Sequence, residues 1–328
     1  MESRKWFKGD THLHTINSDG VLTKGQLVER CKKSGLDFMI ITDHNFNSVK
    51  ESYYDGDMLV IQGQEITGDN GHVNIWGKKV PLEPPYKLDT KEDYKEIIEK
   101  CREAGATITL NHPFCSMCGF RFNIDDIYCD CVEVWNTVQH TDNMINRDWW
   151  VEQLLKGRKI AAVGGSDYHR NYAGLDILAH PTTIVLAEKN TPDEILKAMR
   201  EGRSVITNSP NSAMIELTCG DAVIGDTVDF HNGIEVQVLI TKLPALHTVR
   251  VYNNKTVIYE AKSNSRTDIS SFTCTVREKG FVRAEITYEI GEPVKSLYGA
   301  VEKKILKVKS NGKLPEFVRA FTNPIWFE

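Results

Sequence analysis

The stretch Gly9-Asp10-Thr11-His12-Leu13-His14 contributes most to the fold prediction. Side chains of a β-strand alternate between two faces, so His12 and His14 are expected on the same face of one strand. A second segment, Thr42-Asp43-His44, ends a short apolar run that is typical of a buried strand. Two successive strands that end in imidazole and carboxylate groups predict a metal site at one edge of a sheet or barrel, and so an enzyme.

Strand-like and helix-like signals alternate over the first two hundred residues. Short apolar runs indicate strands, and longer periodic segments that end at glycine indicate helices. The expected strands are 38–42, 58–61, 73–76, 107–110, 132–135, 160–163 and 182–186, and the expected helices include 90–104 and 143–155. Thr23 and Thr191 are plausible helix caps. Repeated strand–helix units predict an α/β fold with a parallel sheet or barrel.

The pattern changes from about Ser209 onward. Strand-like runs recur with turns between them, and no helical period is clear before the end of the chain. We therefore expect a barrel domain over residues 1–208. A small, all-β, sandwich-like module is expected over residues 209–328.

The composition and charge of the chain are those of a globular protein. The chain has 328 residues, a formal net charge of −5 and 41% hydrophobic residues, which is ordinary for a globular protein. The charge gives no strong nucleic-acid signal but allows a small phosphorylated substrate. The sequence shows neither a secretory signal nor a membrane-length apolar run. We expect a cytoplasmic protein with no membrane partner and reduced cysteines, and the oligomeric state stays open.

Candidate metal ligands follow the predicted strands or the loops after them. In chain order they are His12, His14, Asp19, His44, Glu65, His72, His112, Asp167 and His169. Any single histidine is more often a packed or surface residue, but eight or nine candidates, nearly all at predicted strand ends, are hard to obtain by chance. Nine exceed the needs of one ion. They fit two or three divalent ions, Mn, Zn or Fe, with Glu65 as a bridging carboxylate.

The order of four motifs resembles that of the PHP (polymerase and histidinol phosphatase) superfamily. The motifs are Asp10-Thr11-His12-Leu13-His14, Thr42-Asp43-His44, Asn111-His112-Pro113 and Gly165-Ser166-Asp167-Tyr168-His169. The resemblance covers about residues 6–208 and looks most like the stand-alone phosphoesterase branch that includes carbaryl hydrolase. It implies a distorted (β/α)7 TIM-like barrel with a trinuclear centre. The implied ligands are His12, His14, Glu65 and Asp167 for one ion, Glu65, His72 and His112 for a second, and Asp19, His44 and His169 for a third.

The expected activity is metal-dependent hydrolysis of a phosphoester in a small metabolite or nucleotide, with a metal-bridging hydroxide as nucleophile. The catalytic candidates are Glu65, Asp167 and His169, of which His169 could assist the leaving oxygen. The candidate substrate contacts are Arg170, Asn136 and His140, and Asp43 is expected to orient an imidazole. Two alternatives remain open: hydrolysis of a carbamate or carboxylic ester by the same centre, and a non-catalytic binding protein.

The cysteines offer one further pattern. Cys115-x-x-Cys118 and Cys129-x-Cys131 are close in sequence, so a four-cysteine zinc site is conceivable. However, Cys131 begins a predicted strand and the spacing between the two pairs is unusual. Small buried or loop thiols are therefore the preferred interpretation.

Overall fold

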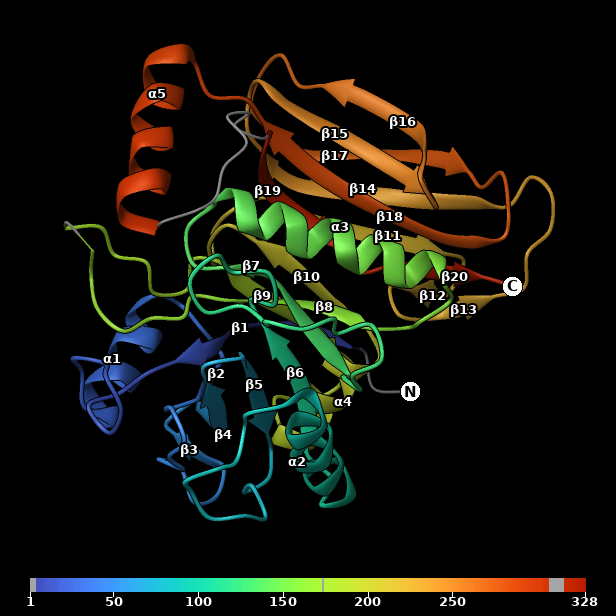
Figure 1. Cartoon of the computed structure of the whole chain (residues 1–328). Coiled ribbons are helices and arrows are strands. Elements are labelled where there is room, and N and C mark those ends of the chain that lie inside the picture. The colour runs from blue at the N-terminus through green and yellow to red at the C-terminus, as the bar shows by residue number, and fades with distance from the viewer. Residues whose placement is uncertain (1–3, 173, 307–315) are drawn as a thin grey trace.

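The computed structural model describes residues 4–172, 174–306 and 316–328. Its N-terminal part is a mixed α/β fold around a strongly curled sheet (Figure 1). The curled sheet consists, in spatial order, of β1 (Lys5–Leu13), β2 (Phe38–Ile41), β4 (Met58–Gly68), β5 (Gly71–Trp76), β6 (Thr107–Asn111), β7 (Cys131–Asn136) and β8 (Ala161–Gly165). β1, β2 and β4 run parallel, as do β6, β7 and β8, whereas β5 is antiparallel to both of its neighbours.

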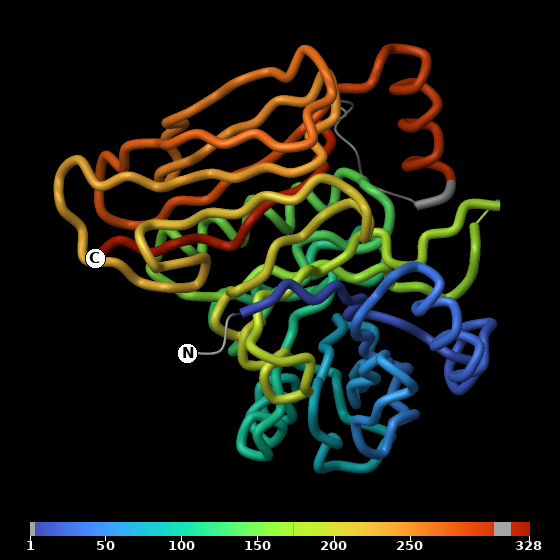
Figure 2. Tube along the Cα trace, turned by 180° about the vertical axis from the view of Figure 1, so that it is seen from behind, coloured from blue at the N-terminus to red at the C-terminus, as the bar shows by residue number. Residues whose placement is uncertain are grey.

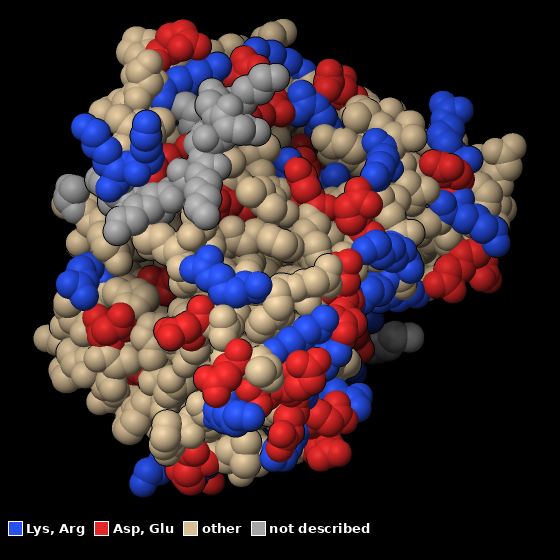
Figure 3. All heavy atoms as spheres, in the orientation of Figure 1, with Lys and Arg blue, Asp and Glu red and all other residues tan. Residues whose placement is uncertain are grey.

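Three helices begin directly after a threonine that acts as the N-terminal cap. α1 (Lys24–Lys33), α2 (Lys91–Glu103) and α4 (Pro192–Arg200) each begin after a threonine whose hydroxyl accepts a hydrogen bond from a backbone N–H of the first turn. The outer surface of α2 mixes charges of both signs, with Lys100 paired to Glu96 and Arg102 to Glu99 (Figure 3). Such pairs keep this helix face in water, while the opposite face packs on the sheet.

The strand–helix alternation is less regular than the sequence predicts. β4 and β5 form a hairpin with a turn of only two residues, and Gly71 at its far side has φ of +135°. β3 (Tyr53–Asp55) is a short antiparallel partner of β4. α3 (Thr141–Leu155) does connect β7 to β8, as expected. The turn of two residues leaves no room for a helix between β4 and β5.

The two edges of the curled sheet approach each other beside β1. His14 donates its backbone N–H to the carbonyl of Tyr168 at 3.1 Å, and Asp10 accepts from the backbone N–H of Ser166 at 3.0 Å. A side chain at Gly165 would place its Cβ only 2.5 Å from the Cβ of His12, so glycine permits the close approach. The ends of β1 and β8 therefore face the same space.

The C-terminal part continues the same hydrogen-bonded sheet. β9 (Thr182–Ala187) pairs with β1, β10 (Ser204–Thr207) with β9, and β19 (Phe317–Thr322) with β10. The path continues from β19 through β18 (Gly280–Tyr288) and β20 (Ile325–Phe327) to β13 (Thr227–Val228). β15 (His247–Asn253) branches off by pairing with β18, and β16 (Thr256–Lys262) pairs with β15. Figure 2 shows the last strands, in red, running between the curled sheet and the strands above it.

A separate antiparallel sheet covers this C-terminal extension. It contains β12 (Ala222–Val223), β11 (Met214–Cys219), β14 (Glu235–Leu243) and β17 (Thr267–Thr275). One apolar cluster joins the two layers, for example Val238 of β14 with Val249 of β15 and Ile286 of β18. The arrangement is sandwich-like, as expected. The domain boundary after residue 208, which falls just past β10, stays a prediction.

The expectation that the module is entirely β was wrong. α5 (Glu292–Val301) and a π-helical turn (Glu302–Leu306) follow β18 and stand apart from the sheets in Figure 1. Pro293 lies in the first turn of α5, a position that proline favours. No residue of α5 is buried: Val294 and Leu297 are exposed, although Tyr298 packs edge-on against Phe317 of β19. Within the described residues, no helix combines the length and apolar character needed to cross a membrane.

Candidate metal centre

The nine predicted ligands come from different strands, yet the structure collects them at one end of the curled sheet. Each of the nine belongs to at least one group of side chains whose potential ligand atoms lie within 4.8 Å of one another. The nine are His12, His14, Asp19, His44, Glu65, His72, His112, Asp167 and His169. His112 and Asp167 have positive φ values of 28° and 51°. Backbone strain of this kind is frequent where strand ends turn toward a functional site.

The deepest group surrounds two carboxylates, Glu65, which is buried, and Asp167, which is partly buried. Asp167 Oδ1 lies 3.4 Å from His12 Nε2 and 3.2 Å from His14 Nε2. Glu65 Oε1 is 3.4 Å from His12 Nε2, and Glu65 Oε2 is 3.6 Å from His14 Nε2. Two ligands on one tetrahedral ion with bonds of about 2.0–2.2 Å are about 3.3–3.6 Å apart. The four side chains are therefore spaced as ligands of a common ion would be.

Three of these atoms lack any other partner. Among the described residues, His12 Nε2, His14 Nε2 and Asp167 Oδ1 are buried and form no hydrogen bond. A buried polar atom without a partner costs roughly 1–3 kcal/mol. The three atoms lie close together, so a single cation bound between them would provide a partner for each.

Glu133 orients the deepest group and escaped the sequence prediction. His12 Nδ1 donates to Glu133 Oε1 at 3.0 Å, which leaves Nε2 as the free, metal-binding nitrogen. Glu133 Oε2 accepts from the backbone N–H of His112 at 3.0 Å. The only signal was a carboxylate within the apolar run 132–135, because such a residue is rarely buried unless paired.

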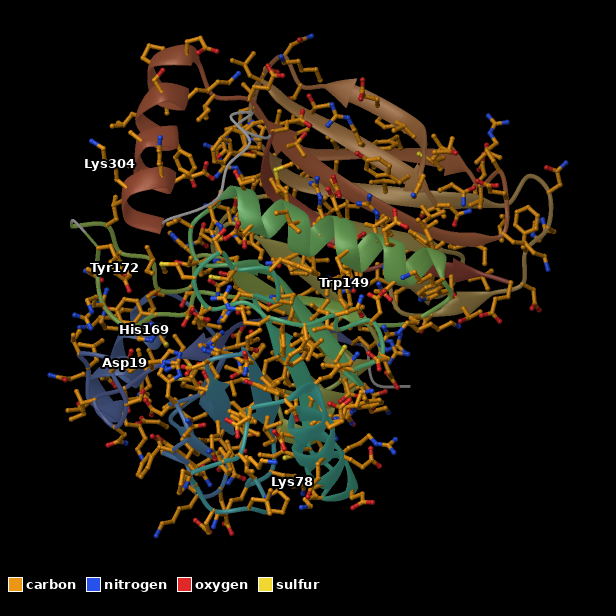
Figure 4. All side chains as sticks on the ribbon, viewed as in Figure 1. Asp19, Lys78, Trp149, His169, Tyr172 and Lys304 are labelled. Atoms are coloured by element: carbon orange, nitrogen blue, oxygen red, sulfur yellow. The ribbon has the colours of Figure 1, made fainter. Side chains whose placement is uncertain are left out.

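A second group lies nearer the surface. Asp19 Oδ1 is 3.1 Å from His169 Nε2 and 3.5 Å from His44 Nε2, and the two Nε2 atoms are 3.5 Å apart. His169 Nδ1 donates to the backbone carbonyl of Asp167 at 2.8 Å, so its Nε2 is free to bind. Figure 4 shows Asp19 and His169 side by side. These spacings again match those of ligands on one ion.

The third group lies on the other side of Glu65. His72 Nδ1 is 3.1 Å from Glu65 Oε1, and His112 Nε2 is 3.6 Å from the same oxygen. Asn111 donates its amide to this oxygen at 2.7 Å and thereby fixes the carboxylate. Ligand atoms of His72, His112 and Cys118 lie within 4.8 Å of one another. Glu65 thus stands between two candidate ion positions.

The charges of the site compensate one another strongly. Burial alone would lower the pKa of His12, but the carboxylates of Asp167, Glu133 and Glu65 outweigh it and raise this pKa well above its usual value. Burial likewise opposes ionisation of Glu65 and Asp167, yet the surrounding histidines, His12 first, hold both pKa values well below the usual range. Burial prevails at His14 and lowers its pKa to about 4. The site can therefore collect positive charge around two fixed carboxylates.

The remaining predicted residues occupy different surroundings. Asn136 donates to Asp167 Oδ2 at 3.2 Å and so touches a candidate ligand. His140 is buried beside Asp142, and burial lowers its pKa to about 4. Arg170 is exposed and donates to the backbone carbonyl of Asp19 at 3.2 Å. Their roles as substrate contacts stay predictions.

Asp43 was expected to orient an imidazole directly, but it contacts His14 only through Ser18. It accepts hydrogen bonds from the Thr15 backbone N–H and hydroxyl, each at 2.7 Å, and from the Ser18 hydroxyl at 2.6 Å. Ser18 Oγ in turn lies 3.5 Å from His14 Nδ1. Asp43 therefore holds the loop that carries Asp19 and supports His14 through Ser18.

The two cysteine pairs do not come together. Cys129 and Cys131 are buried in two different apolar clusters. Cys115 and Cys118 lie on the turn after β6, beside His112. Among the described residues, no candidate metal group contains Cys129 or Cys131. The structure therefore does not support a four-cysteine zinc site.

Comparisons with known proteins give structural neighbours only. No family model and no curated protein matches the chain. A two-domain protein from Bacteroides vulgatus, described as containing a predicted PHP-like metal-dependent phosphoesterase, is similar at 19% identity and a TM-score of 0.48, over 88% of this chain and 92% of that one.

Two further solved structures are shorter. A chain from Bifidobacterium adolescentis, for which a metal-dependent phosphoesterase is proposed, has 15% identity and a TM-score of 0.38, over 52% of this chain and 89% of that one. An amidohydrolase from Chromobacterium violaceum, with sulfate bound and no metal, has 13% identity and a TM-score of 0.35. The match covers 49% of this chain and 87% of that one.

Proposed function

We propose that this protein is a metal-dependent phosphoesterase of the PHP type that hydrolyses a small phosphorylated metabolite or nucleotide. The observation that carries the proposal is the convergence of buried ligand atoms without other partners: His12 Nε2, His14 Nε2 and Asp167 Oδ1 beside Glu65. The donor set of imidazoles and carboxylates suits Mn, Zn or Fe. The assignment of the curled sheet to a distorted (β/α)7 barrel belongs to the same proposal.

The nine ligands divide into three positions in this proposal. His12, His14, Glu65 and Asp167 hold the first ion, Glu65, His72 and His112 enclose the second, and Asp19, His44 and His169 hold the third. Bound divalent ions supply Lewis acidity for phosphoryl oxygens and a water of lowered pKa. The protein's own contribution is to fix the imidazoles: Glu133 holds His12, and the backbone carbonyl of Asp167 holds His169. An ion bound at the third position would stabilise charge on the leaving oxygen, and His169 would act as an acid there only with its Nε2 protonated and not bound to metal.

Substrate recognition in this proposal uses the outer rim. Arg170 is exposed, follows His169 directly and is anchored near Asp19, so its guanidinium can reach a phosphate at the third position. Asn136 and His140 are largely buried, with 6% of each residue exposed. Their contribution is to shape the floor of the site rather than to reach into solvent.

Replacing Glu65 tests the proposal. Glu65→Gln keeps the size of the side chain but removes the charge shared by two ion positions. We expect the metal content to fall and hydrolysis of bis(p-nitrophenyl) phosphate to drop by more than about 100-fold. Elemental analysis and steady-state kinetics measure both. Glu99→Gln, on the exposed face of α2, is the matched control and should change neither. Full metal content and turnover in Glu65→Gln would refute the scheme.

A substrate panel separates the expected ester classes. Manganese-loaded protein is assayed with p-nitrophenyl phosphate, bis(p-nitrophenyl) phosphate, naphthyl esters and naphthyl carbamates. Phosphate release from either phosphoester, at a rate well above that for the carbon esters, supports the proposal. Preference for the esters or carbamates favours the alternative hydrolase. Metal binding without any turnover favours a binding protein.

A further inference from the structure

The turn after β6 brings sulfur to the metal centre. Cys118 Sγ lies 3.5 Å from His112 Nδ1. One tetrahedral zinc with bonds of about 2.3 Å to sulfur and about 2.0–2.1 Å to nitrogen separates these two ligands by about 3.5 Å. The observed distance therefore equals the spacing of a shared ion. Both residues belong, with His72, to one group of mutually close potential ligand atoms.

Glu65 prepares the two histidines for this role. Because a carboxylate only accepts hydrogen bonds, His72 Nδ1, at 3.1 Å from Glu65 Oε1, carries the proton and leaves its Nε2 free. His112 turns Nε2 toward the same oxygen and Nδ1 toward Cys118. Glu65 therefore orients both rings as well as lying between the first two proposed ion positions. The free nitrogens of both rings and the sulfur are thus available together.

We propose that Cys118 is a thiolate ligand of the ion held by His72 and His112, which makes this position selective for zinc over manganese. The inference rests on the proposed metal centre. As the metal–sulfur bond forms, the thiol proton of Cys118 passes to solvent. Thiolate is a soft ligand that suits zinc, whereas manganese favours oxygen ligands. The position thereby differs in chemistry from the other two, which offer only nitrogen and oxygen.

Cys115 does not share this ion. Its sulfur is 3.0 Å from Cys118 Sγ and accepts the Cys118 backbone N–H at 3.4 Å. Two sulfurs on one tetrahedral zinc would be about 3.7 Å apart, given bonds of about 2.3 Å. Cys115 therefore holds the turn that presents Cys118, and Cys115→Ser is the matched control for Cys118→Ser.

Cobalt(II) loading of the full chain tests the proposal. The reduced protein, with all eight thiols verified in denaturant, is titrated with cobalt, and absorption is recorded. We expect a thiolate-to-cobalt charge-transfer band in the wild type and in Cys115→Ser. Cys118→Ser should lose the band but keep the visible ligand-field bands of the remaining cobalt. Its zinc affinity at one position should fall by more than about 100-fold, with manganese affinity unchanged, because loss of a supporting residue alone costs about 10–100-fold.

The outcomes separate this inference from the proposed function. Cobalt binding without a charge-transfer band in the wild type, or a band that survives in Cys118→Ser, overturns sulfur ligation and leaves the metal centre standing. A protein that binds no cobalt, zinc or manganese overturns both.

Discussion

Individual side chains at the centre are held by paired opposite charges before any metal binds. His112 illustrates the balance: burial would lower its pKa, but Glu65 and Asp167 outweigh burial and raise the pKa to about 9. A metal ion binds only an unprotonated nitrogen, so it must displace a proton from this ring below about pH 9. The same carboxylates that attract the cation also stabilise the competing proton.

This competition predicts a pH dependence of metal binding. The protonated fraction of His112 decreases as the pH rises from 6 to about 9, so metal affinity should increase over that range. Binding at pH 7 should release at least one proton. Titration calorimetry in two buffers of different ionisation enthalpy measures the number of protons released. An affinity that stays constant across this range would show that the histidine is not a ligand.

The sequence pointed to the nine candidate ligands because nearly all of them lie at the ends of apolar strands. The structure places the nine side chains close together, and their role as metal ligands stays a prediction. Glu133 and Cys118 were not foreseen as parts of the centre. Glu133 lies in mid-strand with no motif around it, and the proximity of Cys118 to His112 depends on the turn at 113–119. Contacts set by loop conformation have no periodic signature.

At the scale of elements, α5 and its π-helical turn attach to α3 through one buried carboxylate. Glu302 Oε1 accepts the backbone N–H of Thr141 at 2.7 Å and its hydroxyl at 3.0 Å. The cap residue of α3, His140, makes no capping hydrogen bond of its own. Glu302 therefore acts as the N-terminal cap of α3 from a distant part of the chain, where negative charge is favourable.

Glu302→Ala tests this attachment. Loss of the cap should reduce the free energy of unfolding by about 1–2 kcal/mol. Urea titration followed by tryptophan fluorescence measures the change. Glu292→Ala, at the exposed start of α5, removes the same group without a contact to α3 and should have little effect. Equal effects of the two substitutions would contradict the capping role.

The strands were predicted best where a buried face produces a regular apolar pattern in the sequence. β2, β6 and β7 lie within a residue or two of their expected bounds. α5 was not foreseen. Val294, Leu297, Tyr298 and Val301 follow a helical spacing, but the segment is short, contains Gly299 and buries none of its residues.

For the whole molecule, the C-terminal strands tie the curled sheet to the sandwich-like layers. Asn323, fully buried after β19, accepts the backbone N–H of Ala162 at 2.7 Å and donates to the carbonyls of Ala162 and Ser204 at 2.9 and 3.0 Å. One side chain therefore joins β8, β10 and the end of the chain. These hydrogen bonds link the end of the chain to β8, which leads directly to Asp167. Long-range pairing of this kind leaves no local signal in the sequence.

The most direct test of the proposed metal centre is anomalous X-ray diffraction from crystals of the zinc-loaded full chain. The account predicts two or three anomalous peaks: one between His12 and Asp167, one beside His72 and His112, and, where the third position fills, one beside His169. Ions in the first two positions share Glu65 between them. A fully loaded crystal with no peak within bonding distance of His12 and Asp167 would contradict the account.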